Sequence, residues 1–212
     1  MTDQKIALIT GGSRGLGLAV ALALAGEGID TIITYRSKKT EAEAVVASVA
    51  ELGRTAVAFP LDTGTVSTFD DFDDLVNVHL KGVLFLTQKL LPLIADGGSI
   101  VNYSIGLTRF VGDGQSAYAA MKGAIEVLTR YQPKELGPRG IRVNTIAPGP
   151  IATDFGGGVM QTEGFGAAMG ARAALGRAGE PEDVGGAIAS LVSDGSRWIT
   201  GQRIEVPGGT LL

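Results

Sequence analysis

Short apolar runs alternate with longer helical patterns through the first half of the chain. Runs rich in apolar and β-branched residues at 5–10, 31–35 and 55–60 predict buried strands. Alanine- and leucine-rich stretches between them predict helices, and the second of these begins with a capping box of Thr40 and Glu43. Strands and helices that alternate in this way predict a parallel sheet with helices on both faces.

The second half of the chain continues the alternation. We expect a helix at 72–94, a strand at 98–104, a helix at 115–136, a strand at 141–147, a helix at 180–193 and a strand at 202–206. Residues 148–178 are rich in Gly, Ala and Met with weak periodicity, and we interpret them as a mobile lid with short helices. Because there is no internal repeat or low-complexity linker, residues 1–212 are predicted to form one α/β domain on a single doubly wound sheet.

Composition excludes several classes of protein. The chain has 18 basic and 22 acidic residues, and its net charge of -4 argues against general nucleic-acid binding. It has no Cys and one histidine, His79, which excludes disulfides, a thiolate nucleophile and a metal site of clustered Cys or His. No signal peptide is visible, and the longest apolar stretch, 16–26, is shorter than the roughly 20 residues of a membrane helix. We expect a cytoplasmic protein without a metal, nucleic-acid or membrane partner.

A glycine-rich turn, TGGSRGLG at 10–17, follows the first predicted strand and opens a helix. Gly11 permits a sharp turn, while Gly15 and Gly17 let the backbone and the helix approach a diphosphate. The helix N-terminus then offers free N–H groups and a partial positive charge. The alternative is a glycine-rich turn without a ligand. A P-loop is disfavoured because no GK[ST] follows.

The end of the second predicted strand indicates which dinucleotide binds. An NAD site usually places an acidic residue there, but this chain has Tyr35, Arg36, Ser37 and Lys38. Arg36 can hold a 2′-phosphate through its fork of donors, and Arg14 in the glycine turn is a plausible second cation. The alternative is a solvated turn. Two cations and no acid predict NADP(H).

Further motifs support a resemblance that covers nearly the whole chain. They are LDT at 61–63, SIVNYS at 99–104, YAAMK at 118–122, IRVNTIAPGPIAT at 141–153 and ITGQRIEVPGG at 199–209. With the glycine turn, they make the chain resemble the short-chain dehydrogenase/reductase family, in particular members similar to 3-oxoacyl-[acyl-carrier-protein] reductase. The resemblance implies a Rossmann-type NAD(P)-binding fold, a small carbonyl or alcohol substrate, and a homotetramer or homodimer.

The resemblance also implies which residues form the site. Asp62 would lie beside the adenine and Thr153 near the carboxamide of the nicotinamide. The implied cofactor contacts are Gly11, Ser13, Arg14, Gly15, Leu16, Gly17, Tyr35, Arg36, Ser37, Leu61, Asp62, Thr63, Tyr118, Lys122, Pro148, Gly149, Ile151 and Thr153. The implied catalytic residues are Tyr118 and Lys122, with Ser104 as the candidate donor to the substrate carbonyl.

The chemistry of YAAMK can be argued from the residues themselves. Residues four apart share a helix face, so Lys122 is expected close to Tyr118. A tyrosine with its ordinary pKa near 10 is a poor acid or base at neutral pH. We expect the Lys122 ammonium and an oxidised nicotinamide to lower the pKa of Tyr118, and Lys122 to hold the nicotinamide ribose. The alternative is a surface pair without function.

The chain departs from the family pattern at the serine that polarises the substrate carbonyl. Ile105, 13 residues before Tyr118, occupies the position where the family has this serine. Ser104 is one residue early, and on a strand its side chain points to the opposite side. Ser104 can serve only if the strand end turns or bulges. Loss of one such donor typically costs about a hundredfold or more in rate.

A second departure replaces an asparagine of the family by His79. His79 shares a predicted helix face with Leu75, Val83 and Leu86, which favours a partly buried structural histidine. The functional alternative is that it supports a water or proton path to Lys122, in which case its titration at low pH would change activity.

A third departure is the short interval between Asp62 and His79, which are 17 positions apart. Roughly 30 residues of the family pattern, about one strand-plus-helix unit, have no place there. A true deletion would expose a strand edge in the sheet centre and open the nicotinamide pocket. We favour a natural protein that contains a segment absent from this sequence, for which an intact mass above 21.7 kDa would be evidence.

These observations favour an enzyme that reduces a ketone or a 3-oxoacyl thioester with NADPH. The rival is a dinucleotide-binding reductase homologue that has lost catalysis and serves structure or regulation. Ile105, His79 and the short interval favour it, while the intact Tyr118 and Lys122 disfavour it. A Rossmann-like methyltransferase is a third possibility, but it predicts an acidic residue after the second strand and leaves YAAMK unexplained.

Overall fold

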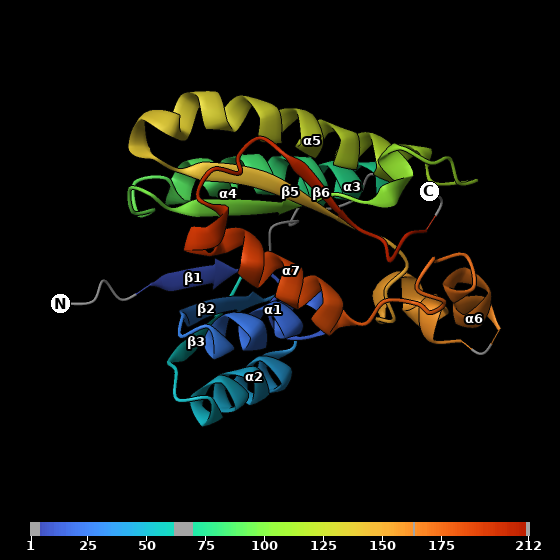
Figure 1. The fold of residues 1–212 in the computed structure, drawn as a ribbon, viewed down its shortest axis with the longest axis horizontal. Coiled ribbons are helices and arrows are strands. Elements are labelled where there is room, and N and C mark those ends of the chain that lie inside the picture. Colours follow the sequence, from blue (N-terminus) through green and yellow to red (C-terminus); the bar gives the residue numbers. More distant parts are fainter. Residues whose placement is uncertain (1–4, 62–69, 163, 211–212) are drawn as a thin grey trace. The chain divides into compact units, whose positions relative to one another are not determined.

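The computed structural model describes residues 5–61, 70–162 and 164–210, and these form two compact units (Figure 1). Of the described residues, 5–61, 150–162, 164–190 and 208–210 belong to the first unit, and 70–149 and 191–207 belong to the second. Each unit contains one parallel sheet with its own helices.

The first unit is built on the strands β1 (Ile6–Ile9), β2 (Asp30–Tyr35) and β3 (Ala56–Pro60). All neighbours in the order β1-β2-β3 are parallel. The crossover helices α1 (Gly15–Gly26) and α2 (Lys39–Glu51) lie beside this sheet in Figure 1. The structure confirms the strand, helix, strand pattern that the sequence predicts for this half.

The start of α2 differs from the prediction. The helix begins at Lys39, and its N-cap residue, Lys38, makes no side-chain capping bond. Thr40 therefore lies inside the first turn instead of before it, and the predicted capping box with Glu43 is wrong. Two ion pairs lie at the first turn instead, one between Lys38 and Glu41 and one between Lys39 and Glu43.

The helix α1 is apolar on all sides and is largely buried in the first unit. Helix α7 (Pro181–Val192) crosses it at a glycine. A Cβ at Gly185 would lie 2.9 Å from the carbonyl oxygen of Ala19, so only glycine allows the two backbones to approach this closely. The contact fixes the N-terminal helix, and with it the glycine turn that precedes it.

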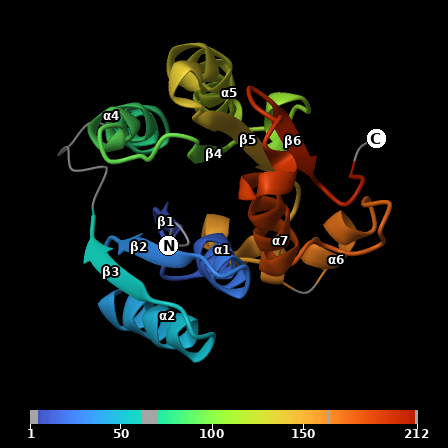
Figure 2. The ribbon, with the colours of Figure 1, turned by 60° about the vertical axis from the view of Figure 1, so that its left-hand side comes forward.

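The second unit contains β4 (Ser99–Tyr103), β5 (Arg142–Pro148) and β6 (Arg203–Val206), again parallel and in that order. The long helix α5 (Ser116–Leu136) and helix α4 (Gly82–Leu90) lie side by side over one face of this sheet in Figures 1 and 2. Below them Leu136, Ile141 and Val143 form a buried cluster.

The helix predicted at 72–94 is found as a run with an interruption. It consists of α3 (Asp70–Val76), a π-helical turn η1 (Asn77–Lys81) and α4. The predicted lid contains a 3-10 segment, η4 (Phe155–Gln161), and the short helix α6 (Phe165–Gly170), so the prediction of short helices is confirmed.

The α/β class with parallel strands and helices is confirmed, but the described strands form two three-stranded sheets where the sequence predicted one. In the Rossmann order another strand lies next to the first one. The short interval between Asp62 and His79 leaves no room for that strand and its crossover, so β1 and β4 each pair with a single described strand. The single-domain organisation of residues 1–212 stays a prediction.

Candidate active site

The glycine turn of the first unit is fixed to β2. Gly11 and Gly15 have positive φ angles of 67° and 53°, which favour glycine. The N–H of Gly11 donates to Thr34 Oγ1 at 3.3 Å, and the N–H of Gly12 donates to the carbonyl oxygen of Thr34 at 2.9 Å. Thr34 thereby holds the turn, a role that no sequence motif indicated.

The start of α1 has the features of an anion site. A Cβ at Gly17 would lie 2.3 Å from the carbonyl oxygen of Gly11, so no other residue fits the turn at this position. The N-cap residue Arg14 makes no side-chain capping bond. The first N–H groups of α1, those of Gly15, Leu16 and Gly17, have no intrahelical acceptor and are suited to a diphosphate. Ser13 is buried just before them.

The segment after position 150 returns to this turn within the first unit. Thr153 is buried, and its Cγ2 would lie 3.9 Å from a Cβ at Gly15. Arg14 forms an ion pair with Asp154 at 2.7 Å, and both side chains are about half exposed. Ile151, two residues before Thr153, is also buried and forms an isolated β-bridge with Gly179. Asp154 was missed at the sequence level because nothing in its spacing points to Arg14.

The end of β2 carries the residues predicted to select the dinucleotide. Tyr35 is the last residue of β2, and its carbonyl oxygen accepts the N–H of Leu61 at 2.8 Å. Arg36 and Ser37 follow and are exposed, and Arg36 has no ion pair within the described part of the chain. Asp62 and Thr63, also predicted to contact the cofactor, lie outside the described residues.

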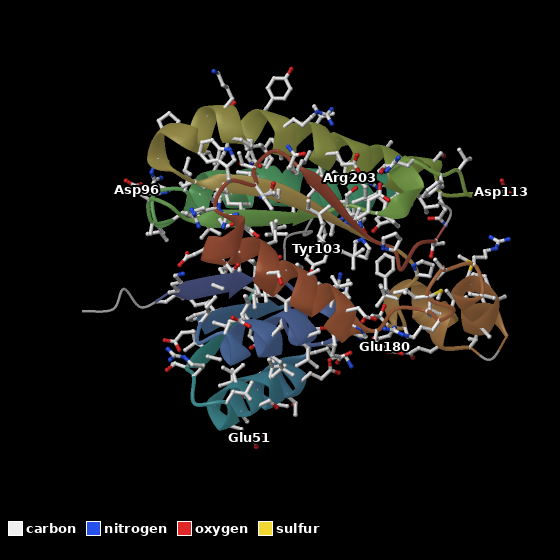
Figure 3. All side chains as sticks on the ribbon, in the orientation of Figure 1. Glu51, Asp96, Tyr103, Asp113, Glu180 and Arg203 are labelled. Atoms are coloured by element: carbon white, nitrogen blue, oxygen red, sulfur yellow. The ribbon has the colours of Figure 1, made fainter. Side chains whose placement is uncertain are left out.

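In the second unit, Tyr118 and Lys122 occupy the first two turns of α5. The Nζ of Lys122 lies 5.6 Å from the centroid of the Tyr118 ring. The same Nζ donates to the carbonyl oxygen of Tyr103, the last residue of β4, at 3.2 Å. Lys122 is 7% exposed. Figure 3 labels Tyr103 on its strand. The sequence could not indicate this acceptor, because a backbone carbonyl carries no residue-type signal.

Burial dominates the electrostatics of the pair. Burial raises the pKa of Tyr118 to about 12, and burial lowers the pKa of Lys122 to about 8. The lowering of the Tyr118 pKa by Lys122 together with an oxidised nicotinamide stays a prediction. The cost of a buried tyrosinate outweighs the attraction of the neighbouring ammonium. Tyr118 is therefore a protonated phenol at neutral pH.

His79 contacts the pair from the π-helical turn. Its ring centroid lies 5.0 Å from that of Tyr118, with an angle of 73° between the ring planes. Burial, and then the positive charge of Lys122, lower the pKa of His79 to about 4. His79 is therefore neutral at the pH where the pair would work.

The titration of His79 gives a prediction for stability. Its pKa is lower in the folded chain, about 4, than the ordinary 6.5, so the unfolded chain binds the proton more readily. The contribution of neutral His79 to the free energy of unfolding is complete above pH 6.5 and is lost as the pH falls toward 4. We expect the free energy of unfolding to fall over this window, and His79→Asn to reduce the slope in urea titrations at several pH values. Equal slopes for both proteins would contradict the shift.

Ser104 is bound to a carboxylate of α5. Its hydroxyl donates to Glu126 Oε1 at 2.5 Å, and the same oxygen accepts from Thr108 and from Arg203 Nε, each at 2.7 Å. Arg203, labelled in Figure 3, comes from β6. These bonds lower the pKa of Glu126 against the opposing effect of burial. Glu126 was missed at the sequence level, because it lies one turn beyond the YAAMK motif with no motif of its own.

The backbone at Ser104 neither turns nor bulges. Its N–H donates to the carbonyl oxygen of Ile146 at 2.8 Å, which continues the ladder of β4 and β5. Ile105 is still extended, with φ −158° and ψ 155°. The condition under which Ser104 could reach a substrate carbonyl is not met, and Ile105 occupies the opposite side of the strand end.

Pro148 and Gly149 end β5 in the second unit. A Cβ at Gly149 would lie 2.7 Å from the Cα of Pro207, so glycine is required for this close approach. The N–H of Gly149 donates to the carbonyl oxygen of Val206 at 3.2 Å.

A cavity of about 170 Å³ lies in the second unit. Its lining residues are Glu126, Thr129, Arg130, Thr145, Gly201, Gln202 and Arg203. Neither Tyr118 nor Lys122 lines it, whereas Glu126, which binds Ser104, does.

Comparison with known proteins agrees with the motifs. Residues 5–70 match the family model described as short chain dehydrogenase, and residues 63–210 match the one described as Enoyl-(Acyl carrier protein) reductase. The chain belongs to the short-chain dehydrogenase/reductase family. It is thus an oxidoreductase, as the sequence predicted. Within the described ranges, no helix is long and apolar enough to cross a membrane, and no three His, Cys, Asp or Glu side chains gather as a metal site.

Relatives in this family cover the chain almost completely. The 3-oxoacyl-[acyl-carrier-protein] reductase FabG of Staphylococcus aureus (strain Mu50) is 32% identical, with 100% of both chains covered. The structure of the reductase LugOII, which catalyses keto-reduction at C1 during lugdunomycin biosynthesis, has a TM-score of 0.91 and 33% identity over 98% of both chains. The angucycline C-6 ketoreductase LanV with bound NADP has a TM-score of 0.91 and 28% identity over 98% of this chain and 95% of LanV.

The length of these alignments bears on the short interval. The alignment with the Staphylococcus reductase sets 248 positions against the 212 residues of this chain, so about 36 positions have no counterpart here. The difference agrees in size with the roughly 30 residues that the spacing indicates, about one strand-plus-helix unit.

Proposed function

We propose that this short-chain dehydrogenase/reductase reduces a ketone or a 3-oxoacyl-type carbonyl with NADPH, and oxidises the alcohol in the reverse direction, with Tyr118 and Lys122 as its acid–base pair. The observation that carries the proposal is the buried Lys122 ammonium, 5.6 Å from the Tyr118 ring. It has no ion pair within the described residues and is held by the Tyr103 carbonyl. A buried ammonium without a carboxylate is costly, and such groups gather at functional sites.

The cofactor is NADP(H), which supplies or accepts the hydride when bound. The free N–H groups at the start of α1 would hold the diphosphate, and the exposed Arg36 would hold the 2′-phosphate. Arg14 would join it after exchanging Asp154 for the phosphate. Pro148, Gly149, Ile151 and Thr153 would bracket the nicotinamide, and Lys122 would hold its ribose. LanV, which is 28% identical to this chain, has NADP bound, which supports the choice of cofactor.

The raised pKa of Tyr118, about 12, suits proton donation, because the phenol is protonated at neutral pH. In reduction the hydride would go to the carbonyl carbon, and the Tyr118 hydroxyl would give its proton to the carbonyl oxygen. The Lys122 ammonium then stabilises the tyrosinate that remains. Since the pKa of Lys122 is about 8, this support weakens above pH 8. With Ile105 in the serine position and Ser104 bound to Glu126, polarisation of the carbonyl rests on Tyr118.

The rival function is a dinucleotide-binding homologue that has lost catalysis. The engaged Ser104 and the apolar Ile105 favour it, because the site lacks a second donor to the carbonyl. NADPH consumption over a panel of ketones and 3-oxoacyl thioesters separates the two functions. Binding of NADPH without turnover on any substrate would favour the rival.

We also propose, from the resemblance, that the protein acts in the cytoplasm as a homotetramer or homodimer on a small-molecule substrate. Light scattering of the purified chain measures the assembly directly.

The choice of dinucleotide can be tested at Arg36. We expect Arg36→Ala to raise the KM for NADPH about tenfold or more and to leave the KM for NADH nearly unchanged, because one charge-assisted contact to the 2′-phosphate is lost. The matched control is Lys39→Ala, which removes a nearby exposed cation that is paired with Glu43. Equal effects of Arg36→Ala on both dinucleotides would contradict the assignment.

A further inference from the structure

His79 lies where the helical run from Asp70 to Leu90 widens into a π-helical turn. π-helical turns are rare in proteins, and those that occur often lie at functional sites. This turn packs against α5, the helix that carries Tyr118 and Lys122. His79 is also the single histidine of the chain, which makes its state measurable without ambiguity.

The two rings meet edge to face. Their centroids are 5.0 Å apart and their planes are inclined by 73°, the arrangement that aromatic pairs favour. The phenolic oxygen of Tyr118 lies on the long axis of its ring, so rotation about χ2 does not move it. Only a swing of the ring about χ1 displaces the oxygen, and a ring packed against Tyr118 opposes that swing.

The neutral state of His79 matters for this contact. Lys122 is close enough that its charge helps to keep His79 unprotonated, after burial. Among ionisable groups, Tyr118 and Lys122 face it from α5, while Asp73, Asp74 and Lys81 of its own helical run are exposed. A proton relay to Lys122 requires an imidazole that gains and loses a proton near the working pH. Both effects that act on His79, its burial and the charge of Lys122, disfavour its protonation there.

We propose that His79 is a positioning residue, whose ring packs against Tyr118 and holds the phenolic hydroxyl where a substrate carbonyl can accept its proton. The inference rests on the proposed function, because the position of that hydroxyl matters only if the protein reduces a carbonyl. It assigns His79 a packing contact with Tyr118, without a proton-transfer step of its own.

Three replacements of His79 separate packing from proton transfer. His79→Phe keeps a ring but has no titratable nitrogen, His79→Asn keeps polar atoms without a ring, and His79→Ala keeps neither. We expect His79→Phe to retain kcat within about threefold with an unchanged pH profile. We expect His79→Asn and His79→Ala to lower kcat about tenfold at nearly constant KM for NADPH, from loss of the ring contact. A tenfold loss and an altered pH profile in His79→Phe, with full activity in His79→Asn, would overturn the proposal.

Proton NMR gives a readout that does not need turnover. The C2–H signal of the one histidine should titrate with a midpoint near pH 4 and should move when Tyr118→Ala removes the neighbouring ring. A midpoint near the ordinary 6.5, with a signal unaffected by Tyr118→Ala, would overturn the contact itself. If the wild-type chain reduces no ketone, the proposed function fails and the NMR result still decides the contact. If it does reduce ketones and His79→Ala equals the wild type, the positioning role alone fails.

Discussion

Tyr118→Phe is expected to lower kcat for carbonyl reduction by about 10²–10⁴-fold, the range that a positioned proton donor contributes. Binding of NADPH should be nearly unchanged, because the ring remains beside Lys122 and His79. The loss should therefore lie in kcat and not in the KM for NADPH. Stopped-flow measurement of NADPH oxidation at saturating dinucleotide reports this step.

The matched control is Tyr131→Phe. Tyr131 lies on the same helix, α5, and is 66% exposed, so its hydroxyl has no part in the site. Its replacement should change kcat by less than about twofold, as for most surface substitutions. Equal activity of Tyr118→Phe and the control would remove Tyr118 from the reaction.

Ile105→Ser is expected to raise kcat, by up to about a hundredfold, because it restores a hydroxyl that can donate to the substrate carbonyl. Ile105 lies at the extended end of β4, on the side opposite Ser104. The gain should depend on Tyr118, so the double variant with Tyr118→Phe should stay near the activity of Tyr118→Phe alone. Steady-state kinetics of the four proteins tests both statements.

Ser104→Ala serves as the comparison for that gain. Its hydroxyl is already bound to Glu126, so its removal is expected to change kcat by less than about threefold. Thr108 and Arg203 still satisfy the Glu126 carboxylate after the change. A hundredfold loss in Ser104→Ala, with no gain in Ile105→Ser, would show that Ser104 is the donor in the working enzyme.

Local sequence patterns predicted most of the elements, because strands and helices bury their apolar positions with different periods. The strand at 31–35 was found within β2, and the helix at 115–136 became α5 almost unchanged. The capping box at Thr40 failed because α2 begins at Lys39, with Lys38 as its N-cap residue, so Thr40 lies inside the helix. The π-helical turn could not be predicted, since an apolar pattern cannot distinguish it from the α-helix around it.

The site was predictable where chemistry follows from spacing along one element. Tyr118 and Lys122 are neighbours because they are four residues apart on a helix. The Tyr103 carbonyl and Glu126 became visible only in three dimensions, since tertiary packing brings them to Lys122 and Ser104. The rise of the Tyr118 pKa through burial could not be predicted, because the depth of burial is not encoded in the spacing.

The two sheets mark the limit of prediction at the level of topology. Alternating strands and helices predicted parallel strands. They did not predict that the described strands form two sheets instead of one. The spacing between Asp62 and His79 was the one warning, and the longer relatives agree with it.

The most direct test of the central claim is NADPH oxidation by the purified wild-type chain with a ketone panel, with product analysis by mass spectrometry. The account predicts one alcohol formed for each NADPH consumed, with a rate that falls above pH 8 as Lys122 loses its proton. NADPH binding without consumption on any carbonyl, or consumption that Tyr118→Phe leaves unchanged, would contradict it.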